Sequence, residues 1–271
     1  MRRMKKGFTL IEVSLFIAIT GLLFVTIIVG TQNSIWQQKY NDSTQNFANF
    51  LKNIYAEVSN TQGVHGGMSD KAIYGKLIVF GEEYELNGDA IPDDGTQKIY
   101  VYDVIGDASG TGTGSITEAL KNLNVTVVKK VTTGESVTGI ELAGILESYS
   151  PIWGSVIETT SSTPMLYKGA ILIVRHPRSG TVNTLVRSTN DSFLQINQKF
   201  VTDNASAKFD GFDTFLTDKL DEFEEKDVDL CLNPHGWNIK SSLRRDIRII
   251  KNARNATGVV IVSDDESVCE K

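Results

Sequence analysis

The chain begins with an apolar segment that carries a single charge. Between Phe8 and Gly30 the only ionisable side chain is that of Glu12. A helix of these 23 residues spans roughly 34 Å at a rise of about 1.5 Å per residue, and a hydrocarbon core is about 30 Å thick. The segment 8–30 therefore predicts a transmembrane helix. An ionised carboxylate in such a helix costs about 2.5 to 3.5 kcal/mol at mid-bilayer and less near an end.

The next segment, 31–62, keeps the helical period but has only one apolar face. Apolar side chains recur at steps of 3, 4 or 7 residues on a background rich in Gln and Asn: Trp36, Tyr40, Phe47, Leu51, Ile54 and Val58. Gly63 marks the expected stop. The pattern predicts one long helix from residue 8 to about residue 61, apolar all round in its first half and amphipathic in its second.

The remaining residues, 63–271, predict one strand-rich globular domain. β-branched or alternating runs lie between Gly, Asp and Asn turns at 72–80, 82–86, 98–105, 125–131, 139–146, 169–175 and 181–187. A capping box formed by Ser115 and Glu118 opens a short helix to about residue 124, and apolar side chains at helical spacing predict another helix over 209–226. The expected fold class is α+β, with the long N-terminal helix packed on an antiparallel β-rich domain.

Charges at the two ends of the apolar segment predict its orientation in the membrane. Four cations and no acid precede it, namely Arg2, Arg3, Lys5 and Lys6, whereas the far flank has only Lys39 before Asp42. The positive-inside rule then places the N-terminus in the cytoplasm and exports the rest of the chain. Trp36 and Tyr40 fall just past the apolar run, where aromatic rings favour the water interface.

Simpler interpretations of the N-terminus remain open at this point. A secretory signal peptide has a shorter apolar region and a small-x-small cleavage site, and residues 28–31 match such a site poorly. A plain single-pass anchor explains everything except the position of Glu12 and the Gly7–Phe8 junction. Thr9 and Glu12 also spell a capping box, which is compatible with a further role for the glutamate.

Residues 6–13, reading KGFTLIEV, and residues 16–23, reading FIAITGLL, resemble the class III signal of type IV prepilins and pseudopilins. The resemblance covers about residues 5–24. It implies that prepilin peptidase removes residues 1–7 by cutting between Gly7 and Phe8, and that the new amine of Phe8 is methylated. It also implies that Glu12 pairs with the Phe8 amine of a neighbouring subunit during assembly, which would neutralise both charges in an apolar environment.

The same resemblance implies the partners and the location of the protein. The partners would be other pilin subunits, the prepilin peptidase, the assembly platform and the membrane. The protein would be a single-pass protein of the cytoplasmic (inner) membrane and, after assembly, part of a cell-surface pilus or pseudopilus. Major pilins commonly have a proline within the membrane helix, whereas this chain has only Gly21 and Gly30 as weak points. The departure favours a minor subunit.

The chain has two cysteines, Cys231 and Cys269, both in the part that would be exported. They fit a disulfide, worth about 4 kcal/mol for a loop of this size, and two free thiols are the alternative. The pair resembles the C-terminal disulfide of many type IV pilins, here closing the region 231–269. A metal site is not expected, because the three histidines show no ligand spacing with either cysteine.

The region between the cysteines is a basic island in an acidic chain. Within it, residues 240–254 contain Lys240, Arg244, Arg245, Arg248, Lys251 and Arg254 against the single Asp246. Loss of the four leader cations would change the net charge from −6 to −10, which disfavours non-specific nucleic-acid binding, yet a local patch can still bind phosphates. The alternative is an amphipathic element whose cations face water. It would be a helix that directs Leu243, Ile247 and Ile250 inward or, as we favour, a strand that directs Ile247 and Ile249 inward and pairs with residues 259–262.

Little else points to chemistry. Residues 107–115 lack the lysine of a phosphate-binding loop and predict a linker, and the aspartates of 87–95 predict a surface turn rather than a calcium site. No catalytic constellation stands out from spacing, so we expect neither an enzyme nor a cofactor.

The expected function is a minor type IV pilin or pseudopilin. The alternatives are a DNA- or surface-binding minor pilin acting through the basic loop, a type II secretion pseudopilin, and an anchored enzyme or receptor.

Overall fold

The computed structural model describes most of the long helix and the core of the domain that follows it. The described residues are 10–60, 71–81, 97–107, 113–128, 147–160, 166–167, 169–187, 216–217, 220–233, 244–251, 253–263 and 266–269. The chain divides into two compact units, Met1–Asp42 and Ser43–Lys271.

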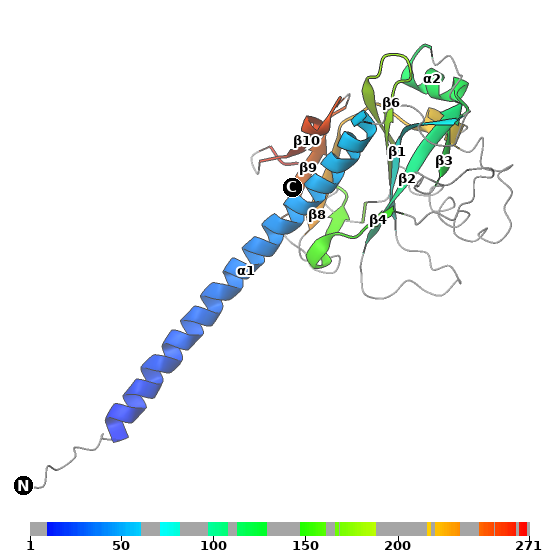
Figure 1. Ribbon diagram of the computed structural model, residues 1–271. Helices are drawn as coiled ribbons and strands as arrows, with labels where there is room; N and C mark the ends of the chain where they lie inside the picture. The colour runs from blue at the N-terminus through cyan, green and yellow to red at the C-terminus, as the bar shows by residue number, and fades with distance from the viewer. Residues whose placement is uncertain are drawn as a thin grey trace, which may run out of the picture. The chain divides into compact units, whose positions relative to one another are not determined.

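A single helix, α1 (Leu10–Asn60), contributes to both units (Figure 1). Its 51 residues agree with the helix predicted from residue 8 to about residue 61. In the first unit its apolar side chains are exposed, and in the second unit its apolar stripe is buried, beginning with Phe47. The buried face therefore starts later along the helix than the periodicity from Trp36 suggested, because Trp36 itself is exposed.

Six antiparallel strands form the larger sheet, sheet A, in the second unit. The path β3-β2-β1-β6-β7 runs through β3 (Thr126–Val128), β2 (Lys98–Asp107), β1 (Lys71–Gly81), β6 (Gly169–Arg175) and β7 (Val182–Arg187). The short β4 (Glu147–Tyr149) pairs with β2 beside β3, since β3 faces Asp103–Ile105 and β4 faces Ile99–Val101. β1 shifts register between Ile73 and Gly75. A Cβ at Gly75 would lie 2.1 Å from the Ile173 carbonyl oxygen, so the close approach of β1 and β6 requires glycine there.

Four antiparallel strands form the smaller sheet, sheet B, in the order β10-β9-β8-β5. They are β5 (Val156–Glu158), β8 (Val228–Asn233), β9 (Arg245–Ile249) and β10 (Val259–Ile261). Short helices complete the described part of the unit: α2 (Ile116–Asn122), η1 (Ile152–Gly154), η3 (Leu220–Glu222) and η4 (Ala256–Gly258). The capping box predicted at Ser115 and Glu118 is present at the start of α2.

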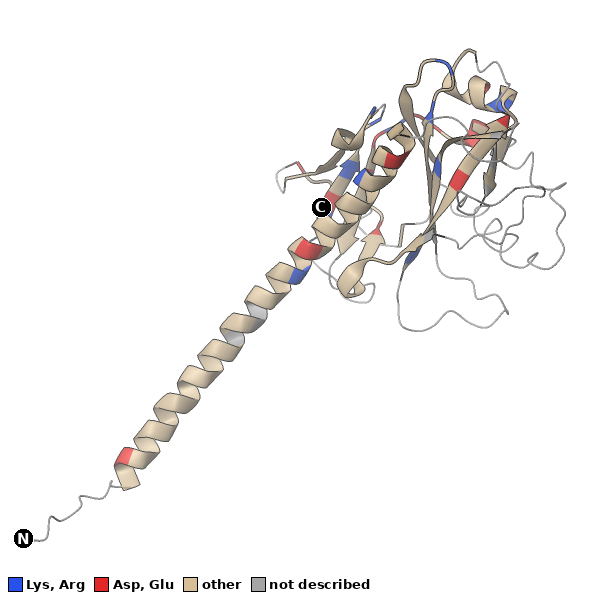
Figure 2. Ribbon diagram, viewed as in Figure 1, with Lys and Arg blue, Asp and Glu red and all other residues tan. Residues whose placement is uncertain are grey.

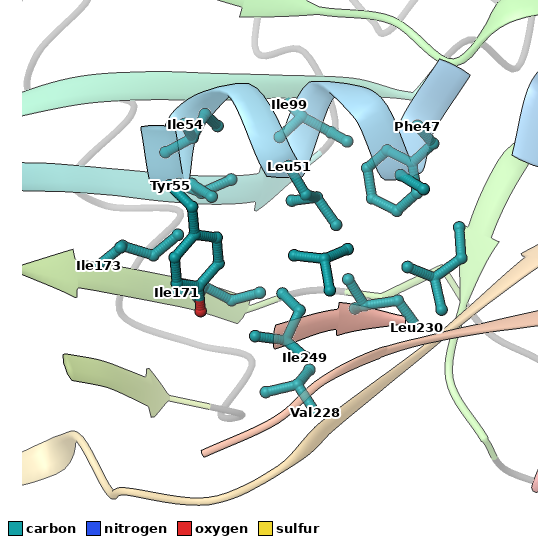
Figure 3. Close-up of a cluster of buried hydrophobic side chains, with 14 of the residues drawn as sticks. Phe47, Leu51, Ile54, Tyr55, Ile99, Ile171, Ile173, Val228, Leu230 and Ile249 are labelled. Carbon is teal, nitrogen blue, oxygen red and sulfur yellow. The ribbon is translucent and has the colours of Figure 1, made fainter. Parts of the chain in front are cut away.

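Two apolar cores cover the two faces of sheet A. In the first, the stripe of α1 packs with one face of sheet A and one face of sheet B, as Figure 3 shows for Leu51, Ile171 and Leu230. In the second, the opposite face of sheet A packs against α2 and the segment around Leu220. The central strands are thus buried on both sides, which explains their continuous apolar sequences.

The structure confirms the α+β class with antiparallel sheets and corrects several details. The strands predicted at 72–80, 98–105, 169–175 and 181–187 are β1, β2, β6 and β7, while the strand at 125–131 is described only as β3. Predictions at 82–86 and 139–146 lie outside the described residues. The helix predicted over 209–226 is wrong at its end: the backbone of Glu224 exchanges hydrogen bonds of 2.8 and 2.9 Å with Val186, because the edge of β7 offers it a strand partner.

Candidate functional site

The exposed apolar half of α1 is the first candidate functional surface. The stretch Leu10–Ile28 is long and apolar enough to cross a membrane. Its large apolar side chains are exposed throughout; Leu22, for example, is 68% exposed. The sequence of α1 has no charged residue between Glu12 and Lys39, and the described ribbon of this stretch in Figure 2 is neither blue nor red. A continuous apolar surface of this kind marks contact with a membrane or with other protein chains.

Four hydroxyl groups of this half form hydrogen bonds within the helix itself. Ser14 Oγ donates to the Ile11 carbonyl at 2.9 Å, and Thr26 Oγ1 donates to the Leu23 carbonyl at 2.8 Å. Thr20 and Thr31 donate in the same way to carbonyls three or four residues earlier. No water is available for such groups in a hydrocarbon environment, so internal bonding is what an apolar surrounding requires.

Glu12 lies in the first turn of α1 and is exposed. An acid in the first turn is favoured by the partial positive charge of a helix N-terminus. In an apolar surrounding the same carboxylate is stabilised by an amine that comes close to it. Gly7 and Phe8, the residues of the predicted processing site, lie outside the described residues.

A cation and an aromatic ring meet beyond the apolar stretch. Lys39 Nζ lies 5.3 Å from the centroid of the Trp36 ring, which is a cation–π distance. Trp36 is half exposed. A ring with an apolar body next to a charged group is suited to a boundary between an apolar and an aqueous environment.

Polar contacts join the start of the packed half of α1 to the strand-rich part of the second unit, which we call the β-domain. The Ser43 hydroxyl hydrogen-bonds to the Ser155 hydroxyl, and Tyr149 Oη donates to Asn46 Oδ1 at 2.7 Å. The Tyr149 ring stacks on Phe50 with ring centroids 4.2 Å apart. Burial raises the pKa of Tyr149, so its hydroxyl stays a donor at all physiological pH values. These contacts fix α1 to β4 and to the segment after η1.

Farther along the packed half, a buried lysine joins three elements. Lys76 Nζ on β1 lies 2.7 Å from Asp103 Oδ1 on β2 and 3.1 Å from Glu57 Oε2 on α1. Burial alone would lower the pKa of Lys76, but Asp103 and then Glu57 raise it above its ordinary value. The lysine is therefore charged and acts as a structural centre. Lys76 is not among the predicted site residues; its signal in the sequence is a lysine and an aspartate that each stand within an otherwise apolar strand.

The two cysteines form the predicted disulfide. Cys231 on β8 is bonded to Cys269, with a Cα–Cα distance of 5.5 Å, and both are fully buried. The described part of the chain contains no free cysteine. The bond therefore fixes the C-terminal segment 266–269 to sheet B.

The basic island forms the predicted strand pair rather than an open basic cluster. Ile247 and Ile249 are buried, and β9 pairs with β10 as expected. Arg244 lies 3.6 Å from Glu158, and Arg248 lies 2.5 Å from Asp229, so acids of β5 and β8 engage two of the cations.

The other members of the island are less enclosed. Arg245 is partly buried on β9, while Lys251 and Arg254 are exposed. Lys240 lies outside the described residues.

Metal binding finds no support in the described part of the chain. No group of three or more His, Cys, Asp or Glu side chains is placed there to hold a metal ion. The aspartate loop 87–95 lies outside the described residues.

Comparison with known proteins finds no match. No family model matches the chain, and neither a curated protein nor a solved structure is similar to it.

Proposed function

We propose that this protein is a minor type IV pilin or a pseudopilin, a structural subunit that assembles into a filament through its N-terminal helix. The observation that supports this proposal most strongly is the division of α1. One uninterrupted helix of 51 residues exposes an apolar half that begins with a glutamate and buries the other half in its own β-domain. The first half is the surface for assembly, and the second half carries the domain.

In this proposal Glu12 specifies how subunits join. Before assembly the apolar half of α1 lies in the membrane, and the β-domain lies outside. After removal of residues 1–7, the amine of Phe8 in one subunit pairs with Glu12 of its neighbour. An ion pair in an apolar surrounding is strongly favoured over two separate charges, so only the register that joins these groups is stable.

The competing proposal of a plain membrane anchor explains less. An anchor needs a helix that crosses the membrane, but it does not need that helix to continue without a break for a further 32 residues to Asn60 and to fill the core of the exported domain. Nor does it need a glutamate in the first turn. A filament subunit needs each of these features.

The first test is mass spectrometry of the N-terminus of the protein from its native membranes. The proposal expects a chain that begins with a methylated Phe8. A chain that retains Met1–Gly7 would contradict it and would favour the anchored protein.

The second test concerns assembly. Glu12→Gln should abolish incorporation into sheared surface filaments while leaving the membrane level of the protein unchanged. Ser14→Ala is the matched control, because it removes a polar group from the same turn region without changing the charge, and it should assemble normally. Normal assembly of the Glu12→Gln variant would refute the proposed role of the ion pair.

A further inference from the structure

Sheet B carries a polar layer on the face opposite its apolar core. Along β8, Val228, Leu230 and Leu232 belong to the core, so the alternating residues between them face away from it. These include Asp229 and Cys231. Cross-strand pairing places Asp229 opposite Arg248 and Cys231 opposite Asp246. This face, which we call the outer face, therefore combines the disulfide with two acids and one arginine.

The two acids share one guanidinium group unequally. Arg248 Nε lies 2.5 Å from Asp229 Oδ1, whereas Arg248 Nη2 lies 3.7 Å from Asp246 Oδ2. Asp246 is 0% exposed, and among the described residues its Oδ1 has no hydrogen-bond donor. Asp229 is partly exposed and lies close enough to Asp246 to form a hydrogen bond when one of the two carries a proton. The buried acid is thus the one whose negative charge is poorly compensated.

Asp246 also holds the C-terminal segment 266–269. The amide of Val268 donates to Asp246 Oδ2 at 3.2 Å, and the amide of Val262 donates to its backbone carbonyl at 2.9 Å. Next to Val268, Cys269 is bonded to Cys231, the residue opposite Asp246 on β8. One covalent and one non-covalent connection therefore fix the segment at the same cross-strand pair.

The surroundings of Asp246 favour its protonated form. Burial, followed by the negative charge of Asp229, raises the pKa of Asp246 to about 6, while the Val268 amide and Arg248 oppose this shift. Asp227 adds a further negative charge near Arg248.

The remaining charged pair that faces the same layer is separate. Glu158 on β5 accepts a hydrogen bond of 3.0 Å from Asn233 and lies 3.6 Å from Arg244. Burial raises the pKa of Glu158, while Asn233 and Arg244 oppose this shift, so Glu158 is a second buried acid of this layer.

We propose that Asp229 and Asp246 form a proton-dependent latch that holds the C-terminal segment 266–269 on the outer face of sheet B. In mild acid, a protonated Asp246 donates to Asp229 and keeps its other oxygen for the Val268 amide. At neutral and alkaline pH, Asp246 is an ionised carboxylate without water. Lifting of the segment admits water to this charge, so the open state becomes more populated.

The direction follows from proton linkage. The closed state binds the proton more tightly than the open state, in which Asp246 is hydrated and has an ordinary pKa of about 3.9. Opening is therefore least frequent in acid and increases as the pH rises through about 6. For these two values the opening constant increases about tenfold between pH 5 and pH 8.

Hydrogen exchange on the full-length protein in detergent micelles tests the latch. The exchange rates of the Val268 and Cys269 amides, divided by their intrinsic rates, should increase about tenfold from pH 5 to pH 8. Asp246→Asn should remove this dependence, because asparagine accepts from Val268 and donates to Asp229 without titrating. Asp229→Asn is the matched control: it keeps the titrating acid but removes its negative neighbour, so the transition should move to lower pH.

A second readout uses the disulfide itself. Cys231 and Cys269 are fully buried, so a phosphine reductant reaches them only when the segment lifts. The rate of reduction between pH 5 and pH 8, corrected with an unstructured peptide disulfide, should follow the exchange data in the wild type and stay constant in Asp246→Asn.

Two results would overturn the latch. One is an equal pH dependence in the wild type and in Asp246→Asn. The other is an identical change at the core amide of Leu230, because that would show opening of the whole sheet rather than of the segment.

Discussion

The two halves of helix α1 use the same kinds of apolar residue for different purposes. Leu22 in the first half is 68% exposed, whereas Leu51 in the second half is 0% exposed and lies in the core between the two sheets (Figure 3). Both belong to one unbroken helix. Helix propensity therefore does not separate them; what differs is whether the chain itself covers the side chain.

This difference assigns the second half of α1 to folding of the domain and leaves the first half for the proposed assembly. Burial of a leucine contributes about 1.5 to 3 kcal/mol, and the second half gains this from its own domain. The first half leaves a row of such side chains without a cover from the described part of the same chain. In the proposed function a membrane or other subunits stabilise this half, so substitutions there should change assembly and leave the stability of the domain unaltered.

The matched pair Leu51→Ala and Leu22→Ala gives the largest expected contrast. Leu51→Ala leaves a cavity in a closed core and should lower the free energy of unfolding by about 3 to 5 kcal/mol. Leu22→Ala should change it by less than about 0.5 kcal/mol. Chemical denaturation of the full chain in detergent, followed by near-ultraviolet circular dichroism, measures both. Equal losses would show that the two halves fold as one cooperative unit.

The buried lysine provides a second matched pair. Lys76→Met removes the ammonium group 2.7 Å from the buried Asp103 and should cost about 3 kcal/mol. The double variant Lys76→Met with Asp103→Leu should recover most of this loss, since it removes both charges.

Lys39→Met is the control for this pair in the first unit. It loses a cation–π contact with a half-exposed ring, so we expect a change of at most about 1 kcal/mol. A loss at position 39 as large as that at position 76 would contradict the distinction between the two units.

Sequence patterns predicted the parts of the fold that have a strong local signal. β1 and β6 are buried on both faces, so each appears as a continuous apolar run, and α2 carries its own capping box. β4 and β5 have three residues each, too few for a pattern, and their position is specified by distant partners. β8 does alternate apolar and polar residues. The acidic stretch before it predicts a helix that continues to residue 226, past the point where the structure has left the helix.

The candidate sites follow the same division. A role for Glu12 could be proposed from the sequence because the residues that suggest it lie within a few positions of it, and this role stays a prediction. Asp246 was counted only as a single acid among cations, because its partners Asp229 and Val268 come from β8 and from the C-terminal segment. No local pattern contains that information.

The carboxylates of Asp246 and Glu12 extend the comparison of the two units to the pH dependence of unfolding. The pKa of Asp246 is raised to about 6, so the folded state binds a proton more tightly than the unfolded state does. The contribution of Asp246 to stability is therefore highest below the unfolded pKa of about 3.9 and decreases as the pH rises to about 6. At pH 8 Asp246→Asn should raise the free energy of unfolding by on the order of 2 kcal/mol and flatten this dependence.

Glu12→Gln is the control, because it lies in the exposed half and should leave the pH profile of unfolding unchanged. Urea denaturation from pH 4 to pH 8 measures both variants. A destabilised Asp246→Asn variant at pH 8 would show that the ionised carboxylate stabilises the fold.

The smallest effect is expected for the exposed cations of the basic island. Lys251 and Arg254 are exposed, whereas Arg244 and Arg248 are engaged by acids of sheet B. The double variant Lys251→Gln with Arg254→Gln should change the free energy of unfolding by less than about 0.5 kcal/mol.

The same double variant also tests DNA binding. Because acids of sheet B already neutralise two cations of the island on an acidic chain, we expect neither the wild type nor the variant to retain duplex DNA at about 0.15 M salt. If the wild type does retain DNA, two lost phosphate contacts should reduce the slope of log affinity against log salt by about 2. That result would favour the DNA-binding alternative and would give the second unit a function beyond carrying the helix.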